Sequence, residues 1–111
     1  MTETNINKVI EDLVSNNEVV LFMKGSSSFP QCGFSAAVVA ILQKLNVNFL
    51  DVNVLEDDEM RQGIKEFSDW PTIPQLYLNG EFIGGCDIIK ELYQSGELQE
   101  ILESKNIKFN N

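Results

Sequence analysis

The amino-acid sequence predicts an α/β domain built on a four-stranded mixed sheet flanked by helices on both faces. Residues 19–24 form a run with apolar residues on both faces, which is typical of a strand covered on both sides. A longer apolar run at 36–45 predicts a helix, and a second strand is expected at 49–54. A strand, a helix and a strand in this order indicate a right-handed crossover and a parallel pair.

The second half of the chain predicts an antiparallel hairpin. The dipeptide Asn79-Gly80 lies between two short apolar segments, 75–78 and 81–83, and is the strongest short-range signal for a two-residue hairpin turn. Before it, Pro71 and Pro74 disfavour helix in the residues that precede them, so an extended loop is expected there. The hairpin supplies the antiparallel strands that make the sheet mixed.

Helices are predicted for the remaining segments. An apolar stripe indicates a helix from Thr4 onward. Its members are Ile6, Val9, Ile10, Leu13 and Val14. The consecutive acids at 56–59 suit the positive end of a helix dipole, and Asp57 is a candidate N-cap. Gly96 is placed to end a later helix, and a last helix is predicted from Leu98 to Leu102.

Length and composition predict a single domain over residues 1–111. The chain has 43% hydrophobic residues, two cysteines and no histidine, which excludes a secreted disulfide framework and a Cys/His zinc set. Its net charge of −9 argues against nucleic acid and anionic membranes as partners, because both would repel it. No signal segment, transit segment or apolar run of membrane-spanning length is recognised. Free thiols and a cytoplasmic location are therefore expected.

The segment from Phe29 to Ser35 (FPQCGFS) is the strongest candidate for chemistry. It places Cys32 where a predicted strand leads into a helix N-terminus. The free N–H groups and the positive dipole end at such a position favour the thiolate over the thiol. The structural alternative is that Cys32 is a small buried apolar residue, as free cysteines often are.

Separate motifs in a fixed order then point to a family. They are Phe22-Met23-Lys24-Gly25, Cys32-Gly33-Phe34-Ser35, Trp70-Pro71-Thr72-Ile73-Pro74-Gln75-Leu76-Tyr77 and Gly84-Gly85-Cys86-Asp87. Together they closely resemble the CGFS-type monothiol glutaredoxins, which implies a thioredoxin fold over nearly the whole chain. One departure is Ser27, which stands where many members of this family carry proline.

The resemblance implies roles for individual residues. It makes Cys32 the redox thiol and the cluster ligand. It implies a glutathione site formed by Lys24, Arg61, Ile73, Cys86 and Asp87.

Some of these residues also have a plain structural interpretation. Lys24 can be an ordinary lysine at a strand end, and Arg61 a solvated charge on a helix. Asp87 can be a helix N-cap, and Cys86 a buried filler whose backbone matters more than its thiol. The backbone of Ile73 would pair with the tripeptide if Pro74 is cis, as in this fold.

Ser35 limits the chemistry of Cys32. It occupies the position of the second cysteine of a dithiol motif, and a hydroxyl cannot resolve a mixed disulfide. Whether Cys86 can reach Cys32 depends on geometry. A glutathione-dependent thiol-disulfide oxidoreductase that uses Cys32 is therefore one prediction. A redox-inert binding module with an ordinary Cys32 thiol is another.

The prediction favoured by the resemblance is an iron-sulfur cluster carrier. A 2Fe-2S cluster ordinarily takes four thiolates, and two chains with two glutathiones would supply four. This implies a homodimer in the cluster-bound form, transfer of the cluster in iron-sulfur assembly or iron homeostasis, and weak oxidoreductase activity at most. Recipient proteins and a BolA-like protein are the partners that the family suggests.

Overall fold

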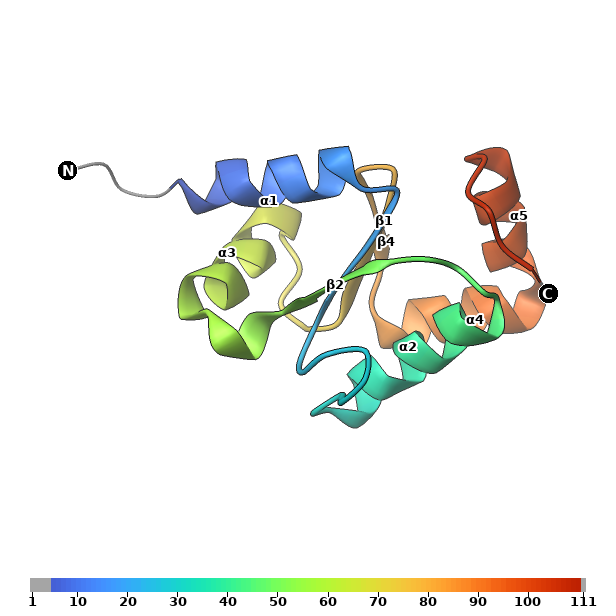
Figure 1. Cartoon of the computed structure of the whole chain (residues 1–111), viewed down its shortest axis with the longest axis horizontal. Coiled ribbons are helices and arrows are strands. Elements are labelled where there is room, and N and C mark those ends of the chain that lie inside the picture. The colour runs from blue at the N-terminus through green and yellow to red at the C-terminus, as the bar shows by residue number, and fades with distance from the viewer. Residues whose placement is uncertain (1–4, 111) are drawn as a thin grey trace.

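The computed structural model describes residues 5–110 (Figure 1). Residues 1–4, which include the predicted helix start at Thr4, and Asn111 lie outside this range. The elements along the chain alternate between helices and strands. They are α1 (Ile6–Asn16), β1 (Val19–Met23), α2 (Gly33–Lys44), β2 (Leu50–Asn53), the 3₁₀ turn η1 (Val54–Glu56), α3 (Asp58–Ser68), β3 (Gln75–Leu78), β4 (Glu81–Gly84), α4 (Cys86–Ser95) and α5 (Glu97–Ser104).

The sheet has four strands in the order β2-β1-β3-β4. Strands β1 and β2 are parallel, whereas β3 is antiparallel to both β1 and β4. The predicted mixed sheet, its parallel pair and its hairpin are thus confirmed. Met23 is paired with Asn53, so β1 and β2 end level at the same edge of the sheet. The loop that leads to Cys32 leaves from this edge.

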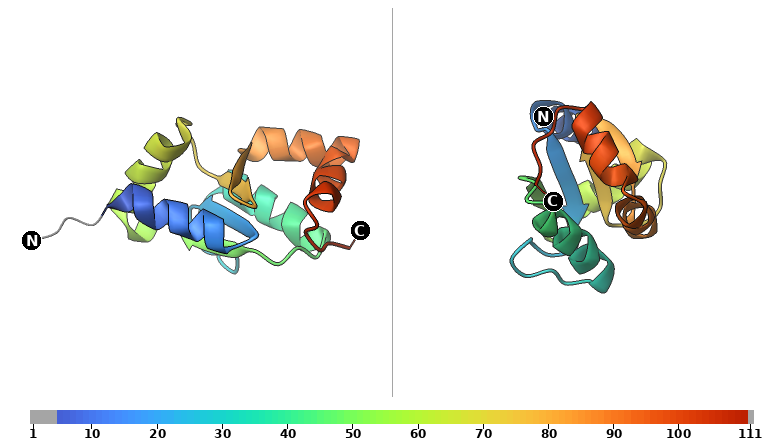
Figure 2. Two further views of the ribbon diagram at one scale, coloured as in Figure 1. Left: turned by 90° about the horizontal axis from the view of Figure 1, so that it is seen from above. Right: turned by 90° about the vertical axis from the view of Figure 1, so that its right-hand side faces the viewer.

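Helices cover both faces of the sheet, as the apolar faces of β1 predict. α1 packs with α3 on one side, and α2 packs with α4 on the other, with α5 against α4 (Figures 1 and 2). All of β1 is buried, and its side chains alternate between the two hydrophobic cores: Val19, Leu21 and Met23 face α2 and α4, whereas Val20 and Phe22 face α1 and α3. Among the described residues, no helix is both long and apolar enough for a membrane span.

Local signals fix several helix ends. The Asp57 carboxylate accepts hydrogen bonds from the N–H groups of Glu59 (3.0 Å) and Met60 (3.3 Å), which confirms it as the N-cap of α3. Gly96 adopts a left-handed φ of 85° and ends α4, as predicted. Helix α2 begins at Gly33 rather than at residue 36, so that Cys32 is its N-cap.

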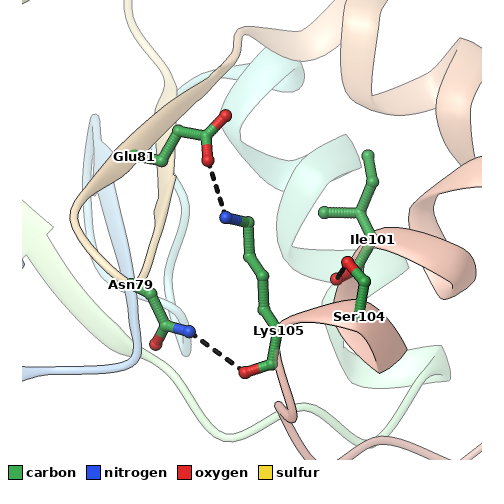
Figure 3. Close-up of polar contacts among 5 residues, drawn as sticks. All are labelled: Asn79, Glu81, Ile101, Ser104 and Lys105. Carbon is green, nitrogen blue, oxygen red and sulfur yellow. Dashed lines mark hydrogen bonds and ion pairs between the residues drawn. The ribbon is translucent and has the colours of Figure 1, made fainter.

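The tip of the β3–β4 hairpin is fixed to the end of α5 (Figure 3). The Lys105 ammonium lies 2.6 Å from the Glu81 carboxylate, and the Asn79 side-chain amide donates to the Lys105 carbonyl oxygen at 3.1 Å. At the end of α5, the Ser104 hydroxyl donates to the Ile101 carbonyl oxygen at 2.8 Å. The C-terminal segment is also held, because the Asn110 N–H donates to the Leu45 carbonyl oxygen at 2.7 Å. These contacts lie at the opposite edge of the sheet from Cys32.

Candidate functional site

Cys32 is presented by a tight loop between β1 and α2. The N–H of Gln31 donates to the carbonyl oxygen of Lys24 at 2.9 Å and closes this loop. Gly25 has a φ of +90°, and a Cβ there would lie 2.5 Å from both the Phe29 carbonyl oxygen and the Gln31 nitrogen. Only glycine fits this close approach without strain. The loop therefore sets the position of Cys32 through its backbone.

The Cys32 thiol lies in an environment that favours the thiolate. The Cys32 side chain forms no regular N-cap hydrogen bond. The backbone N–H of Ser35 nevertheless interacts with the sulfur, stabilises the thiolate and lowers the pKa of the thiol. The Phe34 N–H, the Lys24 charge and the Ser35 hydroxyl lower this pKa further, whereas partial burial opposes them. The predicted effect of the helix N-terminus on Cys32 thus has a local physical cause.

Ser35 is fully buried within the first turn of α2. Its hydroxyl oxygen accepts a hydrogen bond from the backbone N–H of Lys24 at 3.1 Å, which joins the end of β1 to the start of α2. The residue at the position of a second motif cysteine therefore has a structural role here.

A pocket of about 390 Å³ opens beside Cys32. Residues from five parts of the chain line it: the end of β1, the start of α2, α3, the loop before β3 and the start of α4. They are Lys24, Cys32, Phe34, Lys65, Pro71, Thr72, Ile73, Pro74, Cys86 and Asp87. This lining combines two cations, one carboxylate, two thiols and an apolar wall.

All but one of the predicted site residues meet in this pocket. Lys24, Cys32, Ile73, Cys86 and Asp87 line it together. Arg61 does not. The cation that α3 contributes is Lys65, which lies one turn further along the helix. A helical pattern alone does not distinguish these positions, because the tilt of α3 on the sheet decides which of them reaches the pocket.

The buried side-chain amide of Gln75 stabilises the pocket wall formed by residues 71–74. The Ile73–Pro74 peptide bond is cis. The side-chain amide of Gln75, which is fully buried, donates to the carbonyl oxygens of Trp70 and Thr72, each at 3.2 Å. Its oxygen accepts from the Tyr77 hydroxyl at 3.3 Å. Gln75 thus shapes this wall without lining the pocket.

Tyr77 is buried beneath this loop, and its surroundings keep it neutral. Burial raises the pKa of Tyr77 to about 12. A phenol that stays protonated remains a hydrogen-bond donor to Gln75 at neutral pH. Gln75 and Tyr77 belong to a family motif and to a predicted strand, but neither indicates that they support the wall, so this role was not predicted.

The opposite wall is the first turn of α4. Gly85 is its N-cap, so the interpretation of Asp87 as the N-cap is wrong; Asp87 lies in the first turn, where its carboxylate suits the helix dipole. A Cβ on Gly85 would lie 3.2 Å from the Pro74 carbonyl oxygen and 3.5 Å from the Trp70 indole nitrogen. That nitrogen is buried and, within the described chain, has no hydrogen-bond partner. The two walls therefore pack directly against each other.

The Cys86 thiol differs from the Cys32 thiol. Cys86 is buried at 8% exposure, and burial raises the pKa of its thiol. Asp87 and Cys32 raise this pKa further, whereas Lys90 lowers it. Both cysteines are free. Across residues 5–110, no group of three or more His, Cys, Asp or Glu side chains is arranged to hold a metal ion.

Comparisons with known proteins identify the family. The family model for glutaredoxin matches residues 19–83. The chain is 61% identical to a probable monothiol glutaredoxin 2 from Rickettsia conorii, over 94% of this chain and 97% of that protein. The solution structure of reduced apo GrxS14 from poplar is similar with a TM-score of 0.80 and 56% identity, covering 90% of this chain and 92% of that one.

The fold is also shared with a more distant protein. A crystal structure of a buckwheat glutaredoxin-glutathione complex has a TM-score of 0.80 at 22% identity, covering 92% of this chain and 91% of that one. The architecture is that of the thioredoxin fold, as the motifs imply. The order of the elements, the monothiol motif at Cys32 and these similarities lead to one conclusion: the chain belongs to the glutaredoxin family, among its monothiol members.

Proposed function

We propose that the pocket beside Cys32 binds glutathione. This tripeptide carries carboxylates, an ammonium group and a thiol. Lys24 and Lys65 offer positive charge to the carboxylates, and the free N–H groups in the first turn of α4 suit a carboxylate as well. The Asp87 carboxylate suits the ammonium group, and Cys32 lines the same pocket, so that its sulfur can meet the glutathione thiol. The glutathione complex of the buckwheat protein supports this proposal.

We further infer that Cys32 and glutathione together hold a 2Fe-2S cluster that is passed on in iron-sulfur assembly or iron homeostasis. The observation that carries this inference is the combination of an activated Cys32 with a buried, hydrogen-bonded Ser35 at the second motif position. One chain then supplies one activated thiolate, and such a cluster ordinarily takes four. Two chains and two glutathiones complete the set, and glutathione can dissociate when the cluster is handed over.

A second candidate function is glutathione-dependent thiol-disulfide exchange. The lowered pKa of Cys32 favours it, because the thiolate is the nucleophile. The Cys32 thiolate would attack the glutathione sulfur of a mixed disulfide and release the substrate thiolate. The thiolate of a second glutathione would then attack the glutathione sulfur of the Cys32–glutathione disulfide. This step would release the Cys32 thiolate and form oxidised glutathione. The same pKa argues against a redox-inert module, which predicts an ordinary thiol.

Location and macromolecular partners stay predictions. We propose a cytoplasmic location, recipient proteins for the cluster and a BolA-like protein as a further partner. The location rests on the free thiols expected in a reducing compartment, and the partners rest on the family resemblance.

Anaerobic reconstitution with iron, sulfide and glutathione tests the cluster proposal. We expect a coloured dimer, measured by visible spectrum and native mass. Removing glutathione or introducing Cys32→Ser should abolish both colour and dimer, because each removes a ligand. Cys86→Ser is the matched control and should keep both.

The same assay separates the candidate functions. A colourless monomer from the unaltered protein would contradict the carrier proposal. Rapid turnover of a glutathionylated peptide by that protein would favour the oxidoreductase instead. Lys65→Ala should raise the glutathione concentration needed for assembly, and Arg61→Ala should raise it less, because Lys65 rather than Arg61 lines the pocket.

A further inference from the structure

Few large apolar side chains are exposed on the part of the chain that the structure describes. Among residues 5–110, the large exposed hydrophobic residues are Phe29 at 74%, Phe34 at 63% and Leu55 at 45%. Phe34 lines the pocket beside Cys32, so the proposed function accounts for it. Phe29 and Leu55 are not pocket residues, although Phe29 lies three positions before Cys32. Their exposure calls for a separate explanation.

Hydrogen bonds bring Phe29 and Leu55 to one edge of the sheet. β1 and β2 end level there, and the loop after β1 leads to α2 whereas the turn after β2 leads to α3 (Figure 1). The Asn53 side-chain oxygen accepts from the Gly25 N–H at 2.9 Å and from the Leu55 N–H at 3.0 Å. It therefore ties the loop that carries Phe29 to the turn that carries Leu55.

A second contact holds the same loop. The Asp51 carboxylate accepts a hydrogen bond from the Ser27 N–H at 2.7 Å. The loop is thus anchored at two points on β2, and Phe29 is presented from an ordered segment. An exposed aromatic side chain on a rigid loop is typical of a recognition surface, since little entropy is lost when it is covered.

Acidic residues continue this surface. Glu56, Asp57, Asp58 and Glu59 follow Leu55 directly, and all four are exposed. The N-cap role explains Asp57, and Asp58 and Glu59 in the first turn of α3 suit the helix dipole, but their side chains remain free to meet a partner at the surface. The cations of the pocket, Lys24 and Lys65, are not part of this run, so the acidic surface is distinct from the pocket.

We propose that Phe29, Leu55 and the acidic run 56–59, here called the Phe29–Leu55 face, form a docking surface for a basic partner protein. The partner presents an apolar side chain to Phe29 and Leu55 and lysine or arginine residues to the acids. The proposal does not depend on which ligand Cys32 holds.

Charge and area favour this occupant over a second copy of the chain. Two copies would each carry a net charge of −9 and would bring like charges together at this face. The exposed parts of Phe29 and Leu55 offer about 200 Å² of apolar surface, judged from the usual size of such side chains. A stable interface needs about 800 Å² from each partner, so the contact is transient and depends on opposite charge for its rate and specificity.

A titration followed by two-dimensional NMR tests the proposal with a synthetic amphipathic peptide of leucine and lysine as the probe. Shifts are expected at residues 27–31 and 53–60, and binding should weaken as salt is raised. A peptide of leucine and glutamate and a peptide of serine and lysine should bind at least about tenfold more weakly, because each lacks one of the two contacts.

Charge-matched variants make the test specific. The triple variant Glu56→Gln, Asp58→Asn, Glu59→Gln keeps the Asp57 cap and should weaken binding about tenfold, the loss expected for three surface ion pairs. Its control neutralises three exposed acids on α4 and α5: Glu91→Gln, Glu100→Gln and Glu103→Gln. The control should bind the probe within about twofold of the unaltered protein. Phe29→Ser with Leu55→Ser should also weaken binding.

Three results would overturn the proposal. They are shifts centred on α4 and α5, equal losses in both triple variants, and unchanged binding by the Phe29→Ser, Leu55→Ser protein. Dimers of the ligand-free protein that the same double variant dissociates in sedimentation would assign the face to a second copy instead. Cluster assembly is measured separately, so its failure would leave this test unaffected.

Discussion

Cys32 and Cys86 lie at the starts of two helices and line the same pocket, yet their thiols differ. Cys32 is the N-cap of α2, whereas Cys86 is the first residue within α4. An N-cap side chain faces the free N–H groups of the second and third helical residues, which here are Phe34 and Ser35. The side chain of Cys86 instead packs into the hydrophobic core. An offset of one residue at a helix start therefore separates an activated thiol from a structural one.

Alkylation rates measured against pH test whether the two thiols differ in pKa. In the Cys86→Ser protein, Cys32 should reach half its maximal rate below the ordinary thiol value of about 8.5, since a lowered pKa leaves more thiolate at a given pH. In the Cys32→Ser protein, Cys86 should do so above that value, because burial raises its pKa. At pH 7 we expect Cys32 to react faster by on the order of tenfold or more. Equal profiles would refute the distinction.

The substitution Ser35→Ala should separate stability from thiol chemistry at Cys32. It leaves the Lys24 N–H without its acceptor, so the free energy of unfolding in urea should fall by about 1–2 kcal/mol. The backbone N–H of residue 35, which has the largest effect on Cys32, is retained, so the pKa of Cys32 should rise only slightly. Ser104→Ala is the control, because that exposed hydroxyl bonds only within its own helix end. A large pKa change without loss of stability would contradict this account.

The smallest effects are expected for substitutions of the two glycines next to the cysteines in the sequence. Gly85→Ala should cost about 1 kcal/mol of stability and weaken glutathione binding, because the new methyl group would press on the Pro74 carbonyl oxygen. Gly33→Ala meets no atom within 4 Å and should be neutral or slightly stabilising. Urea unfolding and calorimetry with glutathione measure both effects. A similar cost at both positions would show that the wall around Cys86 is no tighter than the start of α2.

The fold was largely predictable because its signals are local. Apolar patterns located the α-helices and the first two strands, Asn79-Gly80 identified the hairpin, and Gly96 identified a helix end, whereas the 3₁₀ turn η1 was not predicted. Helix α2 starts earlier than predicted because the non-apolar Ser35 is buried by a hydrogen bond that periodicity does not reveal.

The candidate site was predictable only where a motif marks it. Cys32, Ile73 and Asp87 were found in this way and line the pocket. The role of Lys65 depends on the orientation of α3, and the support from Gln75 depends on carbonyl oxygens three and five residues before it. Both roles arise from tertiary structure, so a pattern along the chain does not reveal them.

Trp70 gives the pocket an optical property. It is the only tryptophan in the chain, its ring packs on Phe82 with centroids 5.8 Å apart, and its nitrogen lies against Gly85 at the pocket wall. Indole emission responds to the polarity and rigidity of its surroundings. Intrinsic fluorescence therefore follows events at this wall without an attached label, and the signal comes from a single known position.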